Sequence, residues 1–269
     1  MKHFSLCSGI GGLDLAAEWA GFETIAQCEI DEYASKILAK NFKGVPNLHD
    51  IRTVTNERLR ELGITTEEIT VISAGFPCQP YSLAGKGRGD RDERDLWGEV
   101  ARVLGEVKPK WFVGENTPGL FARQNQRFFR RVLDDLTALG YRVGWGIWGA
   151  CDVGAPHRRD RVFIVAYANG ERRNIHEEKK RTAHGKLCKA ISDSDGEREL
   201  QSQRSKQNER RRACDGVWWE VEPDVGRVAN GVPARVDRLR CLGNAVVPQQ
   251  AYPIFKSIAN YEKSKGEKE

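Results

Sequence analysis

Short apolar runs alternate with amphipathic helical segments through the first 140 residues, and this alternation constrains the fold more than any other feature of the chain. The runs expected to be strands are Phe4–Leu6, Thr24–Cys28, Val71–Ala74 and Trp111–Val113. The segments with helical spacing of apolar residues are Leu13–Trp19, Glu32–Asn41, Leu96–Leu104 and Phe128–Leu139. Alternating strand–helix units predict an α/β fold, in which helices cover both faces of a mostly parallel sheet.

The chain after residue 140 departs from this alternation. Tyr141–Trp148 and Val162–Tyr167 have strand character but no long helix between them, so we expect an antiparallel hairpin at one edge of the sheet. The apolar periodicity then fades until Val217, and the last apolar helix is expected at about Gln249–Ile258.

Composition limits the class of protein. No stretch is long and apolar enough to span a bilayer, and Met1 leads straight into a strand, so neither a membrane span nor a signal peptide is expected. The seven cysteines lack paired spacing, which favours a reducing cytosol over a disulfide scaffold, and no His/Cys spacing suggests zinc. We therefore expect a cytoplasmic protein with no metal site and no membrane partner.

The positive charge is concentrated in one polar segment. Residues 171–212 contain 13 Lys or Arg and 8 Asp or Glu, whereas the rest of the chain contains 30 of each, so this segment carries the whole net charge of +5. Such a segment is either a solvated insert or a surface that meets phosphates, and the sequence leaves both interpretations open.

The tripeptide Pro77-Cys78-Gln79 carries the strongest chemical signal. It follows the strand expected at Val71–Ala74 and precedes a glycine-rich, charged stretch, residues 85–94, that is expected to form a mobile loop. A cysteine at the carboxyl end of a strand faces the cleft in which open α/β sheets bind ligands, and thiolates are strong nucleophiles. A buried structural cysteine is the alternative, and the tripeptide alone does not decide between the two.

A glycine-rich turn and two acidic residues follow early strands. The turn, residues 7–12, would let the backbone approach a ligand closely, although nucleotide, flavin and methyl-donor sites all use such turns. Glu29, at the end of the second strand, is either an acceptor for ribose hydroxyls or a surface cap. Asp50 is either an acceptor for an adenine amino group or part of a turn.

Later motifs add further candidates. Glu115 follows a strand and would face the same cleft as Cys78, where partial burial would keep it protonated near neutral pH; a helix-capping turn residue is the alternative. Arg159 and Arg161 stand at alternate positions at the start of a strand and should point the same way, either into the cleft or into an exposed ion-pair lattice. Gly243-Asn244 reads as a turn before the last helix.

The order of these motifs strongly resembles that of the cytosine-C5 DNA methyltransferase family. The order is Gly-Ile-Gly-Gly, Glu29, Asp-Ile, Phe-Pro-Cys-Gln-Pro-Tyr-Ser, Glu-Asn-Thr, Arg-x-Arg and Gly-Asn-Ala-Val-Val-Pro. The resemblance covers Phe4 to about Tyr167 and about Arg238 to Ile258. It implies a Rossmann-like sheet dependent on S-adenosylmethionine, formed by residues 1–168 and 236–269, and a small target-recognition domain at residues 169–235.

The resemblance also implies a reaction. Cys78 would add to carbon 6 of a cytosine swung out of the duplex, and Glu115 would hold or protonate ring nitrogen 3. Arg161 and Arg159 would stabilise the base. Carbon 5 would take the methyl group of S-adenosylmethionine, leaving S-adenosylhomocysteine, and the loop from Pro80 to Asp95 would close over the site.

Contacts to the cofactor and to double-stranded DNA are implied in the same way. The residues expected to bind the cofactor are Cys7, Gly9, Ile10, Gly12, Glu29, Ile30, Asp50, Ile51, Pro77, Leu96, Asn244 and Val246. Those expected to contact DNA are Gln79, Ser82, Lys179, Lys180, Arg181, Arg210, Arg211 and Arg212. A cognate restriction endonuclease is a conceivable partner, the enzyme is expected to be a monomer, and no metal is implied.

The sequence departs from the family pattern at three places. Cys7 replaces an aromatic residue that would stack on adenine, and His157 replaces a glutamine. Residues 217–227 stand where a long motif normally supports target reading, and the short middle segment looks like that of phage or prophage enzymes. The alternatives are a tRNA cytosine-C5 methyltransferase, a non-catalytic DNA-binding relative and a nucleotide-dependent oxidoreductase.

Overall fold

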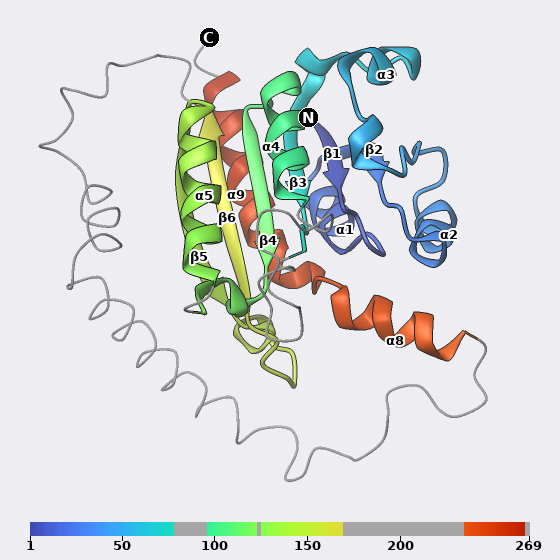
Figure 1. The fold of residues 1–269 in the computed structure, drawn as a ribbon, viewed down its shortest axis with the longest axis vertical. Helices are drawn as coiled ribbons and strands as arrows, with labels where there is room; N and C mark the ends of the chain where they lie inside the picture. Colours follow the sequence, from blue (N-terminus) through green and yellow to red (C-terminus); the bar gives the residue numbers. More distant parts are fainter. Residues whose placement is uncertain (78–95, 123–124, 169–233, 267–269) are drawn as a thin grey trace, which may run out of the picture.

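A six-stranded mixed sheet forms the centre of the molecule (Figure 1). The computed structural model describes residues 1–77, 96–122, 125–168 and 234–266. The strands are β1 (Lys2–Leu6), β2 (Glu23–Cys28), β3 (Ile69–Ala74), β4 (Trp111–Asn116), β5 (Tyr141–Trp148) and β6 (Arg161–Ala168). Their order across the sheet is β2-β1-β3-β4-β6-β5.

The first four strands run parallel, whereas β6 is antiparallel to both of its neighbours. The expected hairpin is therefore confirmed, since β5 and β6 pair from Tyr141↔Ala168 to Trp148↔Arg161. Because β6 runs in reverse, its first residue lies at the edge where β1, β2, β3 and β4 end. That edge is where the sequence predicts the functional site.

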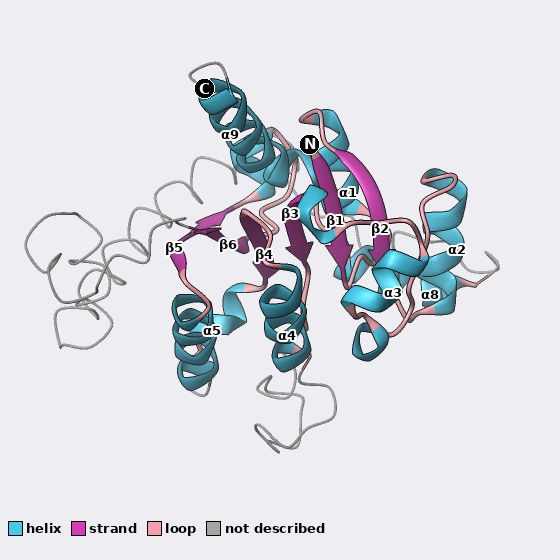
Figure 2. Ribbon diagram, turned by 90° about the horizontal axis from the view of Figure 1, so that it is seen from above, coloured by secondary structure: helices cyan, strands magenta, loops and turns pink. Residues whose placement is uncertain are grey.

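Helices cover both faces of the sheet, as predicted (Figure 2). The helices are α1 (Gly12–Trp19), α2 (Glu32–Asn41), α3 (Asn56–Glu61), α4 (Trp97–Val107), α5 (Gln126–Ala138), α8 (Arg235–Asn244) and α9 (Pro248–Gly266). Short 3₁₀ turns lie at Ile51–Thr53, Thr66–Glu68, Pro118–Phe121 and Ala150–Val153.

Alternation along the strands divides the core between the two faces. Ile72 and Phe112 belong to the cluster under α4 and α5, whereas their neighbours in the same strands, Val71 and Val113, belong to the cluster under α1 and α9. Phe255 of α9 packs edge-on against His3 and Phe22, which brings the last helix beside the first strand. The fold class expected from the sequence is confirmed.

Buried polar side chains link β1 to its neighbours. His3 bonds Thr24 on β2 at 3.0 Å and Ser73 on β3 at 2.8 Å, and burial lowers its pKa to about 3, which keeps the ring neutral. Asp14 of α1 accepts from Ser5 at 3.0 Å and from Gln27 at 2.8 Å. These bonds hold α1 and the first strands in register around the glycine turn, because breaking one would leave a buried partner unsatisfied.

The helix α8 is a correction to the sequence reading, which expected only a turn around Gly243-Asn244. Its sequence carries little apolar periodicity, and Val236 is 74% exposed, so no buried stripe marks it as a helix. The last helix also runs further than expected, through Pro253 to Gly266. Among the described residues, no helix has the length and apolar character needed to cross a membrane.

Candidate active site

Three parallel strands bring candidate residues together at their carboxyl ends. A Cβ placed on Gly75, just after β3, would lie 3.4 Å from Glu115 Oε2 and 3.6 Å from the carbonyl oxygen of Cys7. Gly75 precedes Cys78 by three residues. The predicted nucleophile itself lies outside the described residues, but the chain leads toward it from the centre of this edge.

Asn116 ties the segment before Cys78 to β4. Its side chain is 3% exposed, donates from Nδ2 to the carbonyl oxygen of Phe76 at 3.0 Å and accepts at Oδ1 from the Thr117 amide at 2.8 Å. The sequence analysis quoted this asparagine only as part of a motif. Its position gives it a role, since it holds the backbone beside Pro77.

Glu115 forms a buried ion pair with Arg161. The Arg161 Nε atom lies 2.9 Å from Glu115 Oε1, and the two side chains are 12% and 8% exposed. Burial raises the pKa of Glu115 to about 7, while the charges of Arg161 and then Arg159 oppose this rise. The carboxyl group is therefore poised between its two protonation states near neutral pH, as the sequence predicted for a glutamate in the cleft.

The glycine turn after β1 closes onto Glu29. The Gly9 amide donates to Glu29 Oε2 at 2.7 Å, and the Asp31 amide donates to Oε1 at 2.8 Å. Gly9 has φ of +58°, and nothing lies within 4 Å of the position its Cβ would occupy, so the backbone there is open to a ligand. Cys7 also adopts a positive φ of +49°, which costs energy in a residue with a Cβ.

Asn47 holds Glu29 in place, and the sequence analysis missed it. Its Oδ1 accepts from the Glu29 amide at 2.9 Å, and its Nδ2 donates to the Glu29 carbonyl oxygen at 3.1 Å. No local pattern marks this asparagine, because its partner is 18 residues away. These two hydrogen bonds fix the backbone of Glu29, which was predicted to accept ribose hydroxyls.

The remaining predicted cofactor residues differ in their surroundings. Asp50 caps the turn Ile51–Thr53 by accepting from the Arg52 amide at 3.0 Å, and its other oxygen lies 3.6 Å from Arg52 Nη1, which agrees with the turn interpretation. Ile51 is buried in the core, whereas Ile30 is 63% exposed. Leu96 is half-buried before α4.

The carboxyl-terminal segment folds back against the glycine turn. A Cβ on Gly12 would lie 2.5 Å from the carbonyl oxygen of Val246, so only glycine fits there without displacing the backbone. Asn244, exposed at the end of α8, stands two residues earlier. This arrangement meets the condition for a cofactor contact by Asn244, namely that the last helix returns to the first strand.

Arg159 does not behave as strand alternation predicted. It precedes β6 and adopts a positive φ of +38°, so it does not share a strand face with Arg161. Its guanidinium donates to the carbonyl oxygens of Leu242 at 2.9 Å and Gly243 at 2.7 Å, and also to that of Ala245. The two arginines thus point to different partners, although the charge of Arg159 still acts on Glu115.

Several predicted residues lie outside the part of the chain that the structure describes. They are Cys78, Gln79, Ser82, Lys179, Lys180, Arg181, Arg210, Arg211 and Arg212. The same holds for the proposed closing loop and for residues 217–227. Within the described residues, no group of three His, Cys, Asp or Glu side chains is arranged to hold a metal ion.

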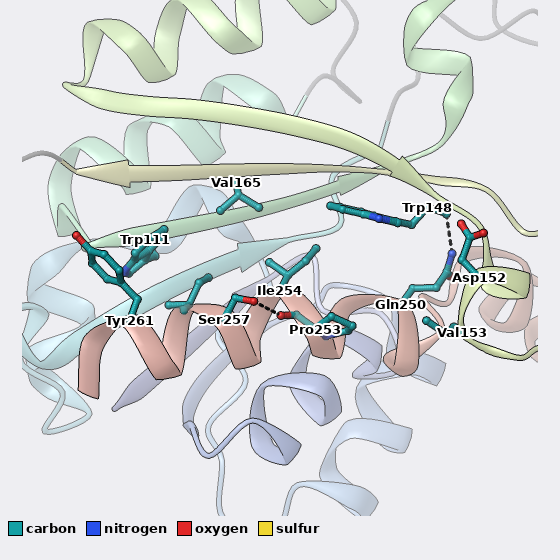
Figure 3. A pocket seen from close by; sticks show the side chains of 11 residues that line it. Trp111, Trp148, Asp152, Val153, Val165, Gln250, Pro253, Ile254, Ser257 and Tyr261 are labelled. Atoms are coloured by element: carbon teal, nitrogen blue, oxygen red, sulfur yellow. Dashed lines mark hydrogen bonds between the residues drawn. The ribbon is translucent and has the colours of Figure 1, made fainter. Parts of the chain in front are cut away.

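An apolar groove of about 830 Å³ lies between α9 and the strands β4, β5 and β6 (Figure 3). Trp111 and Tyr261 line one end, Trp148 and Gln250 line the other, and Val165 lies between the two ends. None of its lining residues was predicted to bind cofactor or base. The groove is on the face covered by α9, whereas the candidate residues gather at the carboxyl edge, so we assign the site from those residues.

Comparisons with known proteins identify the family of the chain. A family model of C-5 cytosine-specific DNA methylases matches residues 1–227. The Type II methyltransferase M.NgoBI of Neisseria gonorrhoeae is 37% identical over 172 residues, which is 62% of this chain and 51% of that protein. M.HaeII of Haemophilus aegyptius is 35% identical over 167 residues, which is 62% of this chain and 50% of that protein.

Solved structures share the architecture. A DNA modification methyltransferase encoded within an E. coli prophage superposes with a TM-score of 0.55 at 27% identity, covering 66% of this chain and 49% of that chain. The Dnmt2 methyltransferase of S. pombe superposes with a TM-score of 0.57 over 95% of this chain and 97% of that chain, but at 16% identity it shows the fold alone. The chain spans about half the length of the curated relatives it matches. Because the family model matches most of the sequence, the protein belongs to the C-5 cytosine-specific DNA methylase family.

Proposed function

We propose that the protein is a DNA (cytosine-5-)-methyltransferase that methylates carbon 5 of cytosine in double-stranded DNA. The observation that carries the proposal is the buried Glu115–Arg161 pair, which stands beside Gly75 where the chain leads toward Cys78. Membership of the methylase family supports the class of reaction. The Type II methyltransferases among its relatives support a role in DNA modification.

Cys78 is the proposed nucleophile. Burial and the charge of Glu29 raise the pKa of Cys7 to about 12, and burial also raises the pKa of Cys28 and of Cys241. The raised pKa values keep Cys7, Cys28 and Cys241 as neutral thiols at neutral pH, which makes these three poor nucleophiles. Cys78 is the cysteine of the Pro-Cys-Gln motif, and it directly follows Pro77, the last described residue before the gap.

The covalent step overcomes the poor reactivity of carbon 5. The Cys78 sulfur forms a bond to carbon 6, and the electrons of the 5,6 double bond move toward carbon 5. Protonated Glu115 donates a hydrogen bond to ring nitrogen 3, and Arg161 holds the carboxyl group in position. After methylation, carbon 5 loses its proton to solvent, the carbon–sulfur bond breaks and the double bond returns. The base reaches this site by leaving the duplex.

The residues at the glycine turn fit an adenosyl group. Each Glu29 oxygen accepts one backbone amide and keeps capacity for a ribose hydroxyl, and the space beside Gly9 is open. S-adenosylmethionine bound there would supply the methyl group, and S-adenosylhomocysteine would leave. In this proposal Gly9, Gly12 and Glu29 hold the cofactor together with Asn244, and the other residues predicted from the sequence complete the pocket.

The basic segment is the proposed DNA contact. Lys179, Lys180 and Arg181, and likewise Arg210, Arg211 and Arg212, would meet phosphates, while Gln79 and Ser82 would contact the strand near the flipped base. We also propose a cytoplasmic monomer of bacterial or phage origin, with a cognate restriction endonuclease as a partner to be sought.

Methylation of cellular DNA tests the proposal. Bisulfite sequencing of DNA from cells that express the protein should show protected cytosines in one sequence context, and cells that express Cys78→Ser should show none. Purified protein with labelled S-adenosylmethionine should label duplex DNA and not tRNA. Labelling of tRNA alone, or no labelling of either, would contradict the proposal.

A further inference from the structure

The carbonyl groups at the end of α8 are held by one side chain from another part of the chain. The last carbonyls of a helix lack partners within it. The guanidinium of Arg159 donates hydrogen bonds to the carbonyl oxygens of Leu242 and Gly243 in the helix. It also donates to the carbonyl oxygen of Ala245, just after the helix. A planar guanidinium with several N–H donors suits this task, and a positive charge is favourable at a helix carboxyl end.

A second set of hydrogen bonds joins the segment between β5 and β6 to the region around the end of α8, and here the donor is a side chain of α9. Gln250, at the start of α9 and 2% exposed, donates from Nε2 to the carbonyl oxygen of Arg159 at 3.0 Å and to that of Trp148 at 2.8 Å (Figure 3). The segment between β5 and β6 therefore binds both sides of the α8–α9 junction, residues 242–250. Arg159 makes these contacts from a backbone with a positive φ of +38°, a conformation that costs energy in a residue with a Cβ.

The junction lies against the glycine turn. The Val246 carbonyl oxygen meets Gly12, and no side chain could be accommodated between them. Earlier in α8, Arg240 pairs with Asp31, the residue whose amide donates to Glu29. The helix α8 thus contacts the residue that bonds Glu29, and the junction after it lies against Gly12; Glu29 and Gly12 were both predicted to bind the cofactor.

We propose that Arg159 is a positioning residue for the cofactor pocket, which fixes the α8–α9 junction against the glycine turn, and that it does not contact the target base. This inference rests on the proposed function, since it takes the pocket to bind the adenosyl part of S-adenosylmethionine. Under this proposal, the two arginines of the Arg-x-Arg motif have different roles. Arg161 orients Glu115 for the base, and Arg159 shapes the pocket for the cofactor.

Cofactor binding and turnover, measured separately on the full chain, test this division. Titration calorimetry with S-adenosylhomocysteine should show that Arg159→Gln weakens binding by about tenfold or more, because hydrogen bonds to several carbonyls are lost together. The KM for S-adenosylmethionine should rise in parallel, while kcat at saturating cofactor and the KM for DNA should stay within about threefold of wild type. Arg159→Lys should bind the cofactor with intermediate affinity, since an ammonium cannot match the planar fork.

Matched variants separate this role from general effects. Arg158→Gln removes the same charge from the neighbouring exposed residue and should leave cofactor affinity within about twofold of wild type. Arg240→Gln, which removes the ion pair between α8 and Asp31, should also weaken cofactor binding. If Arg159→Gln does not fold, Arg159→Lys and Arg240→Gln carry the test.

The outcomes also distinguish this inference from the proposed function. Arg159 variants that keep wild-type cofactor affinity but lose kcat would overturn the inference. They would indicate instead that Arg159 stabilises the target base. Equal weakening of cofactor binding by Arg158→Gln would overturn it as well. Wild-type protein that binds no S-adenosylhomocysteine and methylates no DNA would contradict the proposed function itself.

Discussion

Ionisation of Glu115 should switch methyl transfer off above neutral pH. The proposed hydrogen bond to ring nitrogen 3 requires a protonated carboxyl group, and burial raises the pKa of Glu115 to about 7. At that pKa, about nine-tenths of the molecules carry the proton at pH 6, about half at pH 7 and about one-tenth at pH 8. Activity that depends on this proton should fall about tenfold for each pH unit above 8.

The same pKa has a consequence for stability. The folded protein binds this proton more tightly than the unfolded chain, so the stabilisation is fully present below pH 4.5 and is lost as pH rises through about 7. Raising the pKa from 4.5 to about 7 corresponds to about 3 kcal/mol of folding free energy. The pKa of about 7 includes the effect of Arg161 and Arg159, whose charges lower the pKa while burial raises it by more.

The assay is kcat/KM for DNA from about pH 5.5 to about pH 9.5, because this quantity reports groups of the free enzyme. Glu115 should produce a fall in kcat/KM on the alkaline side. Glu115→Gln keeps a neutral donor that cannot ionise, so it should lose this fall. An unchanged alkaline fall in Glu115→Gln, or wild-type activity that still rises at about pH 9, would refute the assignment.

Three further predictions test the architecture and the DNA contact. Gly12→Ala should push the Val246 carbonyl aside, destabilise the protein by about 1–3 kcal/mol and weaken cofactor binding in calorimetry, whereas Gly144→Ala, which points into open space, should do neither. Trp97→Ala should cost about 3–5 kcal/mol in chemical unfolding because the ring is fully buried, and Trp97→Phe should cost less, since it loses mainly the bond to Asp135. An equal cost for both would contradict this packing. Neutralising Arg210, Arg211 and Arg212 together should reduce the slope of log K against log salt by up to about 3 in DNA-binding titrations, and an unchanged slope would make them a solvated surface.

The strands could be predicted from the sequence because their signals are local. Tyr141–Trp148 was predicted with the bounds that the structure has, and the hairpin followed from the absence of a helix after it. The helix α2 was also predicted with its observed bounds from its apolar spacing, and the structure adds that the Asp31 side chain caps it by accepting from the Ala34 amide. For these two elements, the local sequence pattern was enough to predict the bounds.

Features that depend on distant partners could not be predicted in this way. Helix α8 has no apolar stripe, and its position comes from Arg159 and from the Arg240–Asp31 pair. Asn47 acts through hydrogen bonds to a residue 18 positions away. Arg159 has a positive φ of +38°, which breaks strand alternation, and its guanidinium contacts carbonyl groups 83 and 84 residues away.

The candidate site was predicted largely because the carboxyl ends of parallel strands meet at one edge. Glu115 and the glycine turn lie there as expected, and so does the backbone that leads to Cys78. What sequence reasoning lacked was the division of labour between the two arginines. Strand alternation predicted that both side chains point the same way. In the structure, Arg161 pairs with Glu115, whereas Arg159 bonds carbonyl groups at the end of α8.

Trapping the covalent adduct tests the central claim most directly. Duplex DNA with 5-fluorocytosine at the target position cannot lose a proton from carbon 5, so the adduct should persist once the methyl group has been transferred. Wild-type protein with S-adenosylmethionine should give a denaturation-resistant complex, and the DNA should map by mass spectrometry to the peptide that contains Cys78. A complex attached at Cys7 or another cysteine, or methyl transfer that survives in Cys78→Ser, would contradict the account.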